Sequence, residues 1–395
     1  MKAHRQNSTA GIGKNVDPEA RQGHLGRRAL LRGCGAVLVA AGWAPSLFAA
    51  SPEVPDASGV INFMSWEGYD FPEQMKAWRE AHGVEVQSTY MGSHDDIQAK
   101  ILGGGGAGLD LITYGSSYKE LYKGLKILTP IDEAKIPNLK NLLPFFASNV
   151  QNIWVDADGT RTGVPADWGA IGISYDSAVI AEAPTSYDIL FDPKYKGKVG
   201  MPDDPLGAYG QAARVLGLDS SKMTEEHFKT VTDWLKDLAK QTKGISPSYG
   251  DVSTRFIAGD IMLSFMGWAA YKSFGAAAGK NTIETVWPEK GGGLSFSNAW
   301  AIPPGADNID TVYAWINETL RPDVNAATAT FLVGGVVVDG AAQLLDAVTA
   351  ALYPYDKLEE FFALAPLQQD PPLESDRYVT RQRVLAAWQE VKSAG

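Results

Sequence analysis

Residues 61–72 of the chain read INFMSWEGYDFP, and they decide how the fold begins. A short apolar run breaks into a polar, aromatic loop, and Met75 and Trp78 then fall on one face of a predicted helix over residues 72–82. Ligands of open α/β sheets bind where a strand ends and the chain turns toward a helix. We therefore interpret the run as the first strand of an α/β domain and expect its loop to present Trp66 to a small molecule.

Further strand and helix patterns follow this stretch. Residues 84–90 alternate like a strand, and Ser93 favours the start of a helix that carries Ile97 and Ile101 on one face. Residues 109–113 are apolar enough for a third strand. The order predicts a βαβαβ unit at the start of a parallel sheet.

No pattern indicates a catalytic or metal centre. Gly103–Gly108 contains G-x-G-x-x-G, but it follows a helix and precedes a strand, the reverse of what phosphate binding requires. The chain has no G-x-S-x-G and no H-E-x-x-H, and His82, His94 and His227 lack a second ligand at metal-binding spacing. We expect no catalytic residue, no metal and no cofactor.

The first fifty residues have the pattern of a targeting segment. Residues 27–32 read RRALLR, a twin-arginine pattern, and an apolar run over residues 33–43 leads to a small-residue end at residues 47–50. The alternative is a membrane anchor, but the run is shorter than the ~20 residues that a spanning helix needs. We predict that residues 1–50 are a removable signal peptide that directs the protein to the periplasm by the twin-arginine route.

The charge of the remaining chain excludes some partners. Residues 1–50 contain seven basic and two acidic residues, so their removal takes the formal net charge from −11 to −16. An acidic protein is a poor match for nucleic acid or an anionic membrane surface. The one cysteine, Cys34, lies in the removed segment, and a chain without cysteine can function in an oxidising compartment.

The chain is long enough for two lobes, with two predicted crossings between them. Residues 164–175 lead from a predicted hairpin (153–164) into a second parallel region, and the extended residues 293–301 lead back. We expect one lobe from residues 59–164 with 299–340 and the other from residues 165–298 with 341–395, joined by a hinge. The other expected elements are strands at 198–201 and 261–266 and helices at 208–216, 225–241, 311–320, 324–332, 341–352 and 378–392.

Several short motifs, taken in their order along residues 59–340, resemble one family. The chain is similar to periplasmic substrate-binding proteins of ABC transporters, of the spermidine/putrescine-binding type. The resemblance rests on Trp66 with Tyr69, residues 108–112 with 114–118, residues 124–132, residues 164–165 with 168–173, residues 196–199 with 203–204, residues 266–268, and Asn298 with residues 301–303.

The resemblance implies a fold and a mode of binding. Such proteins have two α/β lobes, each with a mixed, mainly parallel sheet flanked by helices, and they close on a ligand at the hinge. Polyamine binders of this type line the cleft with aromatic faces and hold each ammonium group with a carboxylate. The ligand-binding residues expected here are Trp66, Glu67, Tyr69, Ser116, Ser117, Tyr118, Trp168, Asp203, Trp268, Phe296 and Asn298.

Each of these residues has a structural alternative. The Trp side chains could instead pack in the core, Tyr69 could cap a helix, and Glu67 could be a solvated loop acid. Ser116, Ser117 and Tyr118 could form a turn, and Asp203 could be the acid at a helix N-terminus. Phe296 and Asn298 are chosen from the resemblance alone.

The carboxylates of the family pattern are displaced or absent in this chain. The first-loop acid stands at Glu67 instead of the position of Gly68, Ala269–Tyr271 lacks an acid, Asn298 replaces another, and Gly207 stands at a fourth such position. A buried ammonium group without a counter-charge costs several kcal/mol. A ligand with one cationic group, or a zwitterion, is therefore favoured over a polyamine unless an acid compensates; the acids available are Glu67, Asp167, Asp203 and Asp204.

The sequence thus predicts a monomeric transport receptor that captures a small polyamine-like or other cationic or zwitterionic amine by lobe closure and delivers it to a membrane permease. A secreted α/β enzyme and a periplasmic sensor subunit without transport are the alternatives.

Overall fold

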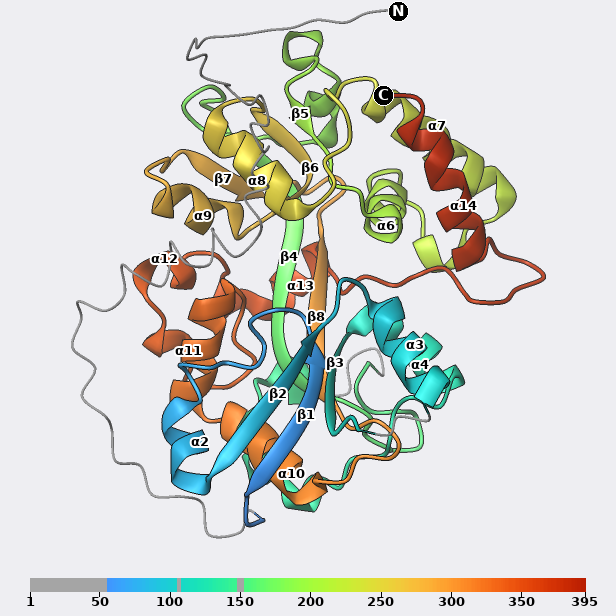
Figure 1. Ribbon diagram of the computed structural model, residues 1–395. Helices are drawn as coiled ribbons and strands as arrows, with labels where there is room; N and C mark the ends of the chain where they lie inside the picture. The colour runs from blue at the N-terminus through green and yellow to red at the C-terminus, as the bar shows by residue number, and fades with distance from the viewer. Residues whose placement is uncertain (1–54, 105–107, 148–152) are drawn as a thin grey trace, which may run out of the picture. The chain divides into compact units, whose positions relative to one another are not determined.

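The computed structural model describes residues 55–104, 108–147 and 153–395, and these belong to one compact unit. The predicted signal peptide therefore lies outside the described residues. The described chain forms a mixed α/β fold around a sheet of eight strands, in the order β2-β1-β3-β8-β4-β6-β5 with β7 paired to β4 (Figure 1). The strands are β1 (Gly59–Ser65), β2 (Val84–Tyr90), β3 (Leu111–Gly115), β4 (Val164–Asp176), β5 (Val199–Gly200), β6 (Leu263–Trp268), β7 (Ile283–Val286) and β8 (Leu294–Ala301).

The predicted parallel start of the sheet is confirmed. β1 pairs in parallel with β2 on one side and β3 on the other. Helix α2 (Lys76–His82) connects the first two strands. It begins later than predicted, because residues 72–75 form turns after Phe71, whose backbone is left-handed (φ 45°). Helix α3 (His94–Gly104) buries Ile97 and Ile101, as its pattern predicts.

Strands β4 and β8 are central to the sheet. They pair antiparallel with each other, while β8 also pairs with β3 and β4 also pairs with β6 and β7. Figure 1 shows them running between the group of β1 to β3 and the group of β5 to β7. The prediction that residues 164–175 enter a second parallel region is wrong, because β4 pairs antiparallel with all of its neighbouring strands. Parallel pairing is confined to β1–β2, β1–β3 and β5–β6 among the described strands.

The buried apolar side chains form two large clusters that these strands share. Val164 to Ala170 of β4 belong to the first cluster, and Ile171, Ile173 and Tyr175 belong to the second. The second cluster is otherwise built mainly by residues 180–266 and 379–391, whereas residues 299–367 pack in the first. The predicted lobe boundary at residue 340 stays a prediction.

Helices of the second cluster begin at well-defined caps. Asp204 caps α6 (Pro205–Val215) by accepting a hydrogen bond from the Gly207 N–H, and Thr224 caps α7 (Glu225–Ala239). Helix α14 (Arg381–Lys392) packs against both, and Figure 1 shows it beside α7. The remaining α-helices are α4 (Lys119–Gly124), α5 (Pro144–Ala147), α8 (Tyr249–Ala258), α9 (Tyr271–Ala277), α10 (Ile309–Thr319), α11 (Pro322–Leu332), α12 (Ala347–Ala350) and α13 (Leu358–Leu364).

Two local predictions have different outcomes. The turn at residues 156–159 is confirmed: the Asp156 N–H bonds to the Thr160 carbonyl at 2.8 Å, and Val155 pairs with Arg161. A continuous helix over residues 341–352 is wrong. Leu345 is extended, and Asp346 caps a new helix, α12, so the segment is broken there.

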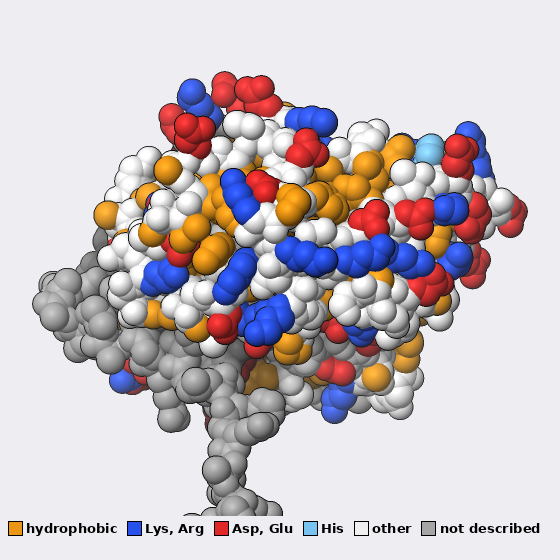
Figure 2. Space-filling view, turned by 90° about the horizontal axis from the view of Figure 1, so that it is seen from above, with side chains coloured by type: hydrophobic (Ala, Val, Ile, Leu, Met, Phe, Trp, Pro, Cys, Tyr) orange, Lys and Arg blue, Asp and Glu red, His pale blue; other side chains and the backbone are white. Residues whose placement is uncertain are grey.

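The face of the molecule shown in Figure 2 carries both signs of charge, with basic side chains gathered near the middle of the view. The negative net charge of the chain is therefore not uniform over its surface. No helix in the described part of the chain is both long and apolar enough to span a membrane.

The close pairing of β4 with β6 generates a stability prediction. A Cβ at Gly267 would collide with the backbone nitrogen and side chain of Ser174 on β4. Gly267→Ala should therefore lower stability by about 1–3 kcal/mol in urea denaturation. Gly103→Ala is the control, because Gly103 lies in α3 with open space around it; this change should be neutral or stabilising. Equal stability of the two variants would contradict the prediction.

Candidate functional site

The Trp66 loop begins where β1 ends. Trp66 is half-buried and meets His94 edge-on, with ring centroids 5.3 Å apart, and Glu67 beside it is also half-buried. Gly68 has φ 98°, a conformation that side-chain-bearing residues rarely adopt, and a Cβ there would come within 3.2 Å of the Phe331 ring. The turn therefore requires glycine where the family pattern places an acid.

A buried carboxylate stands close to this loop instead. Tyr69 donates its hydroxyl to Asp167 Oδ2 at 3.0 Å, and the Asn298 amide donates to Asp167 Oδ1 at 3.0 Å and to the Tyr69 oxygen at 2.7 Å. Asp167 and Asn298 are register partners on β4 and β8. Two predicted site residues, Tyr69 and Asn298, are thus joined through an acid that the sequence offered only as a possible replacement.

The Asp167 carboxylate has no counter-charge in the described protein. Its residue is 4% exposed, and burial raises its pKa to about 6 although Asn298 and Tyr69 hydrogen-bond to it. No Lys, Arg or His among residues 55–104, 108–147 and 153–395 forms a salt bridge with it. An ionised carboxylate in this environment would be stabilised by an incoming cation.

The segment after β3 supplies a second part of the site. Ser116–Tyr118 form a 3-10 turn, and neither serine hydroxyl has a hydrogen-bond partner in the described residues. The Tyr118 ring lies 4.1 Å from the His94 ring and 4.3 Å from the Arg381 guanidinium carbon. Burial, helped by the nearby Arg381 charge, lowers the pKa of His94 to about 3, so this imidazole is neutral.

Two more aromatic side chains approach from β6 and β8. Trp268 and Phe296 are both half-buried, with ring centroids 6.4 Å apart, and Phe296 occupies the space above Gly169. Trp268 also meets Tyr249 edge-on at 6.3 Å. Its indole nitrogen is buried without a hydrogen-bond partner among the described residues, which leaves a donor for an acceptor atom.

The neighbouring acids Asp203 and Asp204 have different environments. Asp203 is exposed and accepts hydrogen bonds from Trp388 and from Lys392, the latter at 3.1 Å, so it anchors α14. Asp204 accepts from the Tyr249 hydroxyl at 2.9 Å, and burial raises its pKa while the Arg381 charge opposes that shift. The structure therefore places Asp204, rather than the predicted Asp203, beside the aromatic side chains.

Trp168 is placed in the core. It is fully buried, its Nε1 donates to the Val336 carbonyl at 2.9 Å, and its ring packs against Tyr353 at 4.3 Å and Phe362 at 4.8 Å. Ala166 and Ala170, on either side of it in β4, also belong to the first cluster. The structure thus gives Trp168 a packing role instead of the ligand contact expected from its motif.

Arg381 and Asp370 were missed by sequence reasoning. Arg381 opens α14, and its Nη1 lies 2.6 Å from Asp370 Oδ2 in a pair whose side chains are only 10% and 6% exposed. No motif marks either residue, and both are distant in sequence from Tyr118, which Arg381 contacts. The feature that marks them as site candidates is that both are charged side chains buried in the structure.

These residues form a series of neighbours that we call the aromatic–acid circuit. One part runs from Asn298 past Gly115 to His94 and on through Tyr118 to Arg381 and Asp370. The other part runs from Asp204 through Tyr249 and Trp268 to Phe296, two residues from Asn298 on β8. The members of the circuit are Trp66, Tyr69, His94, Tyr118, Asp167, Asp204, Tyr249, Trp268, Phe296, Asn298, Asp370 and Arg381.

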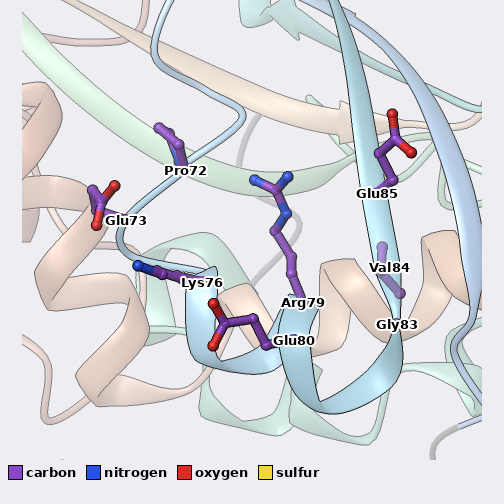
Figure 3. A pocket seen from close by; sticks show the side chains of 8 residues that line it. All are labelled: Pro72, Glu73, Lys76, Arg79, Glu80, Gly83, Val84 and Glu85. Carbon is purple, nitrogen blue, oxygen red and sulfur yellow. The ribbon is translucent and has the colours of Figure 1, made fainter.

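A hollow elsewhere on the surface lacks these features. Figure 3 shows it between α2 and the start of β2, lined by charged and mostly exposed side chains and by no aromatic ring. None of its residues was predicted for the site. No group of three or more potential metal ligands occurs in the described residues either.

Comparisons with known proteins agree with this fold. The Escherichia coli (strain K12) putrescine-binding periplasmic protein PotF is 27% identical over 356 residues, covering 85% of this chain and 91% of PotF. Among solved structures, the PotD substrate-binding protein of Streptococcus pneumoniae has a TM-score of 0.70 at 22% identity, and the Tp0655 lipoprotein of Treponema pallidum has 0.71 at 20%. These structures are covered to 99% and 100%, and each match covers 85% of this chain.

The model of one protein family matches residues 73–353, which is most of the chain. This stretch includes both central strands and eight of the twelve members of the aromatic–acid circuit. Trp66, Tyr69, Asp370 and Arg381 lie outside it. The chain therefore belongs to the family of bacterial extracellular solute-binding proteins.

Proposed function

We propose that the protein binds a small amine within the aromatic–acid circuit and hands it, unchanged, to the permease of an ABC transporter. The relatives named for putrescine or spermidine binding support an amine as the ligand. The side chains proposed to contact it are Trp66, Glu67, Tyr69, Ser116, Ser117, Tyr118, Asp167, Asp204, Trp268, Phe296 and Asn298.

The uncompensated Asp167 carboxylate carries this proposal. Tyr69 and Asn298 neutralise none of its charge, since both are neutral donors. A protonated amine would supply the missing charge and form charge-assisted hydrogen bonds. The family pattern has acids at the positions of Gly68 and Asn298. Asp167 can therefore supply the negative charge that these two residues lack.

The aromatic side chains provide the second component. Trp66, Trp268 and Phe296 are all only half-buried, unlike the fully buried Trp168 and Trp300. Aromatic faces that remain accessible attract an ammonium group and cover the methylene groups attached to it. This combination favours a short alkyl amine over a sugar or a nucleotide.

The biological setting is part of the same proposal. Export of the chain by the twin-arginine route would place it in the periplasm, where it would act as a monomer and catalyse no reaction. Its two proposed lobes, residues 59–164 with 299–340 and residues 165–298 with 341–395, would close on the ligand through β4 and β8. Because the ligand would touch both, it would stabilise the closed state.

A thermal-shift screen of the chain without residues 1–50 tests the proposal. We expect stabilisation by at least one amine among alkyl amines, betaines, amino acids and polyamines, because ligand binds only the folded state. Trp66→Ala should weaken binding of that amine about tenfold or more, measured by calorimetry, through loss of an aromatic contact.

Trp78→Ala is the matched control. Trp78 is also half-buried and packs on the first cluster, but it contacts His82 and Trp315 outside the circuit. Its replacement should lower stability and leave affinity unchanged. Affinity within twofold of the parent for Trp66→Ala would show that the circuit is not the binding site.

The raised pKa of Asp167 predicts how binding depends on pH. Below about pH 6 this carboxyl is protonated, so a cationic ligand must displace a proton. Affinity should increase as the pH rises from 5 to 7, with proton release that calorimetry in two buffers detects. Asp167→Asn should weaken binding at pH 7 and flatten the profile.

The same pKa shift makes the ligand-free protein less stable as the pH rises through 6, because the ionised form is disfavoured by burial. Asp203→Asn is the control, since Asp203 pairs with Lys392 at the surface. A pH profile that is the same in Asp167→Asn and the parent would exclude Asp167 as the ligand's counter-charge.

A further inference from the structure

The environment of Arg381 resembles the environment that an amine ligand needs. Its guanidinium carbon lies 4.3 Å from the Tyr118 ring centroid, within the range of a cation–π interaction. Its Nη1 is paired with the Asp370 carboxylate at 2.6 Å, and Asp204 is close enough for Arg381 to oppose the rise of its pKa. Arg381 thus already places a positive charge of the protein against an aromatic face and beside acidic side chains.

The surrounding charges are consistent with an internal cation. The charge of Asp204 raises the pKa of Asp370, and the charge of Arg381 lowers the pKa of both acids. Removing Arg381 would leave the Asp370 carboxylate and the Tyr118 face without the positive charge that now contacts them. By contrast, Asp167 lacks a salt bridge in the described residues and belongs to a separate part of the circuit.

Arg381 reaches this position from the C-terminal segment. Its backbone N–H bonds to the Pro372 carbonyl at 2.9 Å, and Thr380 caps the helix that it begins. Tyr118, which it covers, belongs to the turn after β3. Arg381 is therefore held at its backbone by the start of α14 and at its guanidinium group by Asp370.

We propose that Arg381 fills a cation site from within, and that the proposed ligand is therefore limited to a single positive charge. This inference rests on the proposed function. The guanidinium occupies the place between Tyr118 and Asp370 where a second cationic group of a diamine would bind. The ligand's one ammonium group is left to Asp167 and the Trp66 side of the circuit.

The test compares butylamine, putrescine and agmatine by calorimetry. Agmatine carries an ammonium and a guanidinium group, so its second group matches the side chain that Arg381→Ala removes. We expect the parent to bind the two dications no more tightly than butylamine. Arg381→Ala should gain about tenfold or more in its affinity for agmatine relative to butylamine, from a restored cation–π contact and ion pair.

Arg383→Ala is the matched control, because Arg383 lies on the same helix and over the Phe228 ring at 4.6 Å, but at the exposed surface. It should bind all three amines like the parent. Arg381→Gln is the second variant should Arg381→Ala not fold, since its amide can still hydrogen-bond to Asp370; it should gain agmatine affinity as well. Methylguanidinium should raise the melting temperature of either Arg381 variant and not that of the Arg383 variant.

Two results would overturn the inference alone: tighter binding of putrescine or agmatine than of butylamine by the parent, or no gain in agmatine affinity relative to butylamine in the folded Arg381 variants. Failure of the parent and of every variant to bind any amine would instead overturn the proposed function, and the inference with it.

Discussion

The hydrogen-bonded pairing of β4 with β8 is the constraint on which both the fold and the site depend. These strands contribute side chains to both large apolar clusters, so the two clusters cannot form independently of this ladder. The same ladder sets Asp167 opposite Asn298, beside a register shift between Pro165 and Asp167. A local irregularity in a strand re-aims its side chains, and here it lies next to the buried acid. Scaffold and candidate site therefore share one set of backbone contacts.

Electrostatics explains why the displaced acids of the family pattern need not abolish amine binding. A carboxylate at Gly68 would require a backbone conformation unsuited to it, and Asn298 is neutral. In the proposed site, Asp167 would supply one negative charge from a strand instead of a loop, and Tyr69 and Asn298 donate hydrogen bonds to it. The proposed carboxylate thus stands at a different position along the chain from the acids of the family pattern.

The C-terminal segment adds a feature that the central sheet does not. Arg381 and Asp370 are buried charged residues, which are costly unless paired, and they are paired with each other. Their contact with Tyr118 brings the last helix to the turn after β3. The circuit consequently combines an acid that lacks a counter-charge with a cation that the protein supplies itself, and this asymmetry sets the expected charge of the ligand.

The sequence by itself determined the fold class, the parallel start of the sheet and the two central strands, because strand and helix periodicity and turn residues are local signals. The aromatic residues that it nominated for the site stay a prediction. The sequence could not separate Trp168, which is core, from Trp268, which is half-buried, since both follow similar motifs. It also could not choose between Asp203 and Asp204, or find Arg381 and Asp370. Burial and charge pairing arise from contacts between segments distant in the chain, so only the tertiary structure decided them.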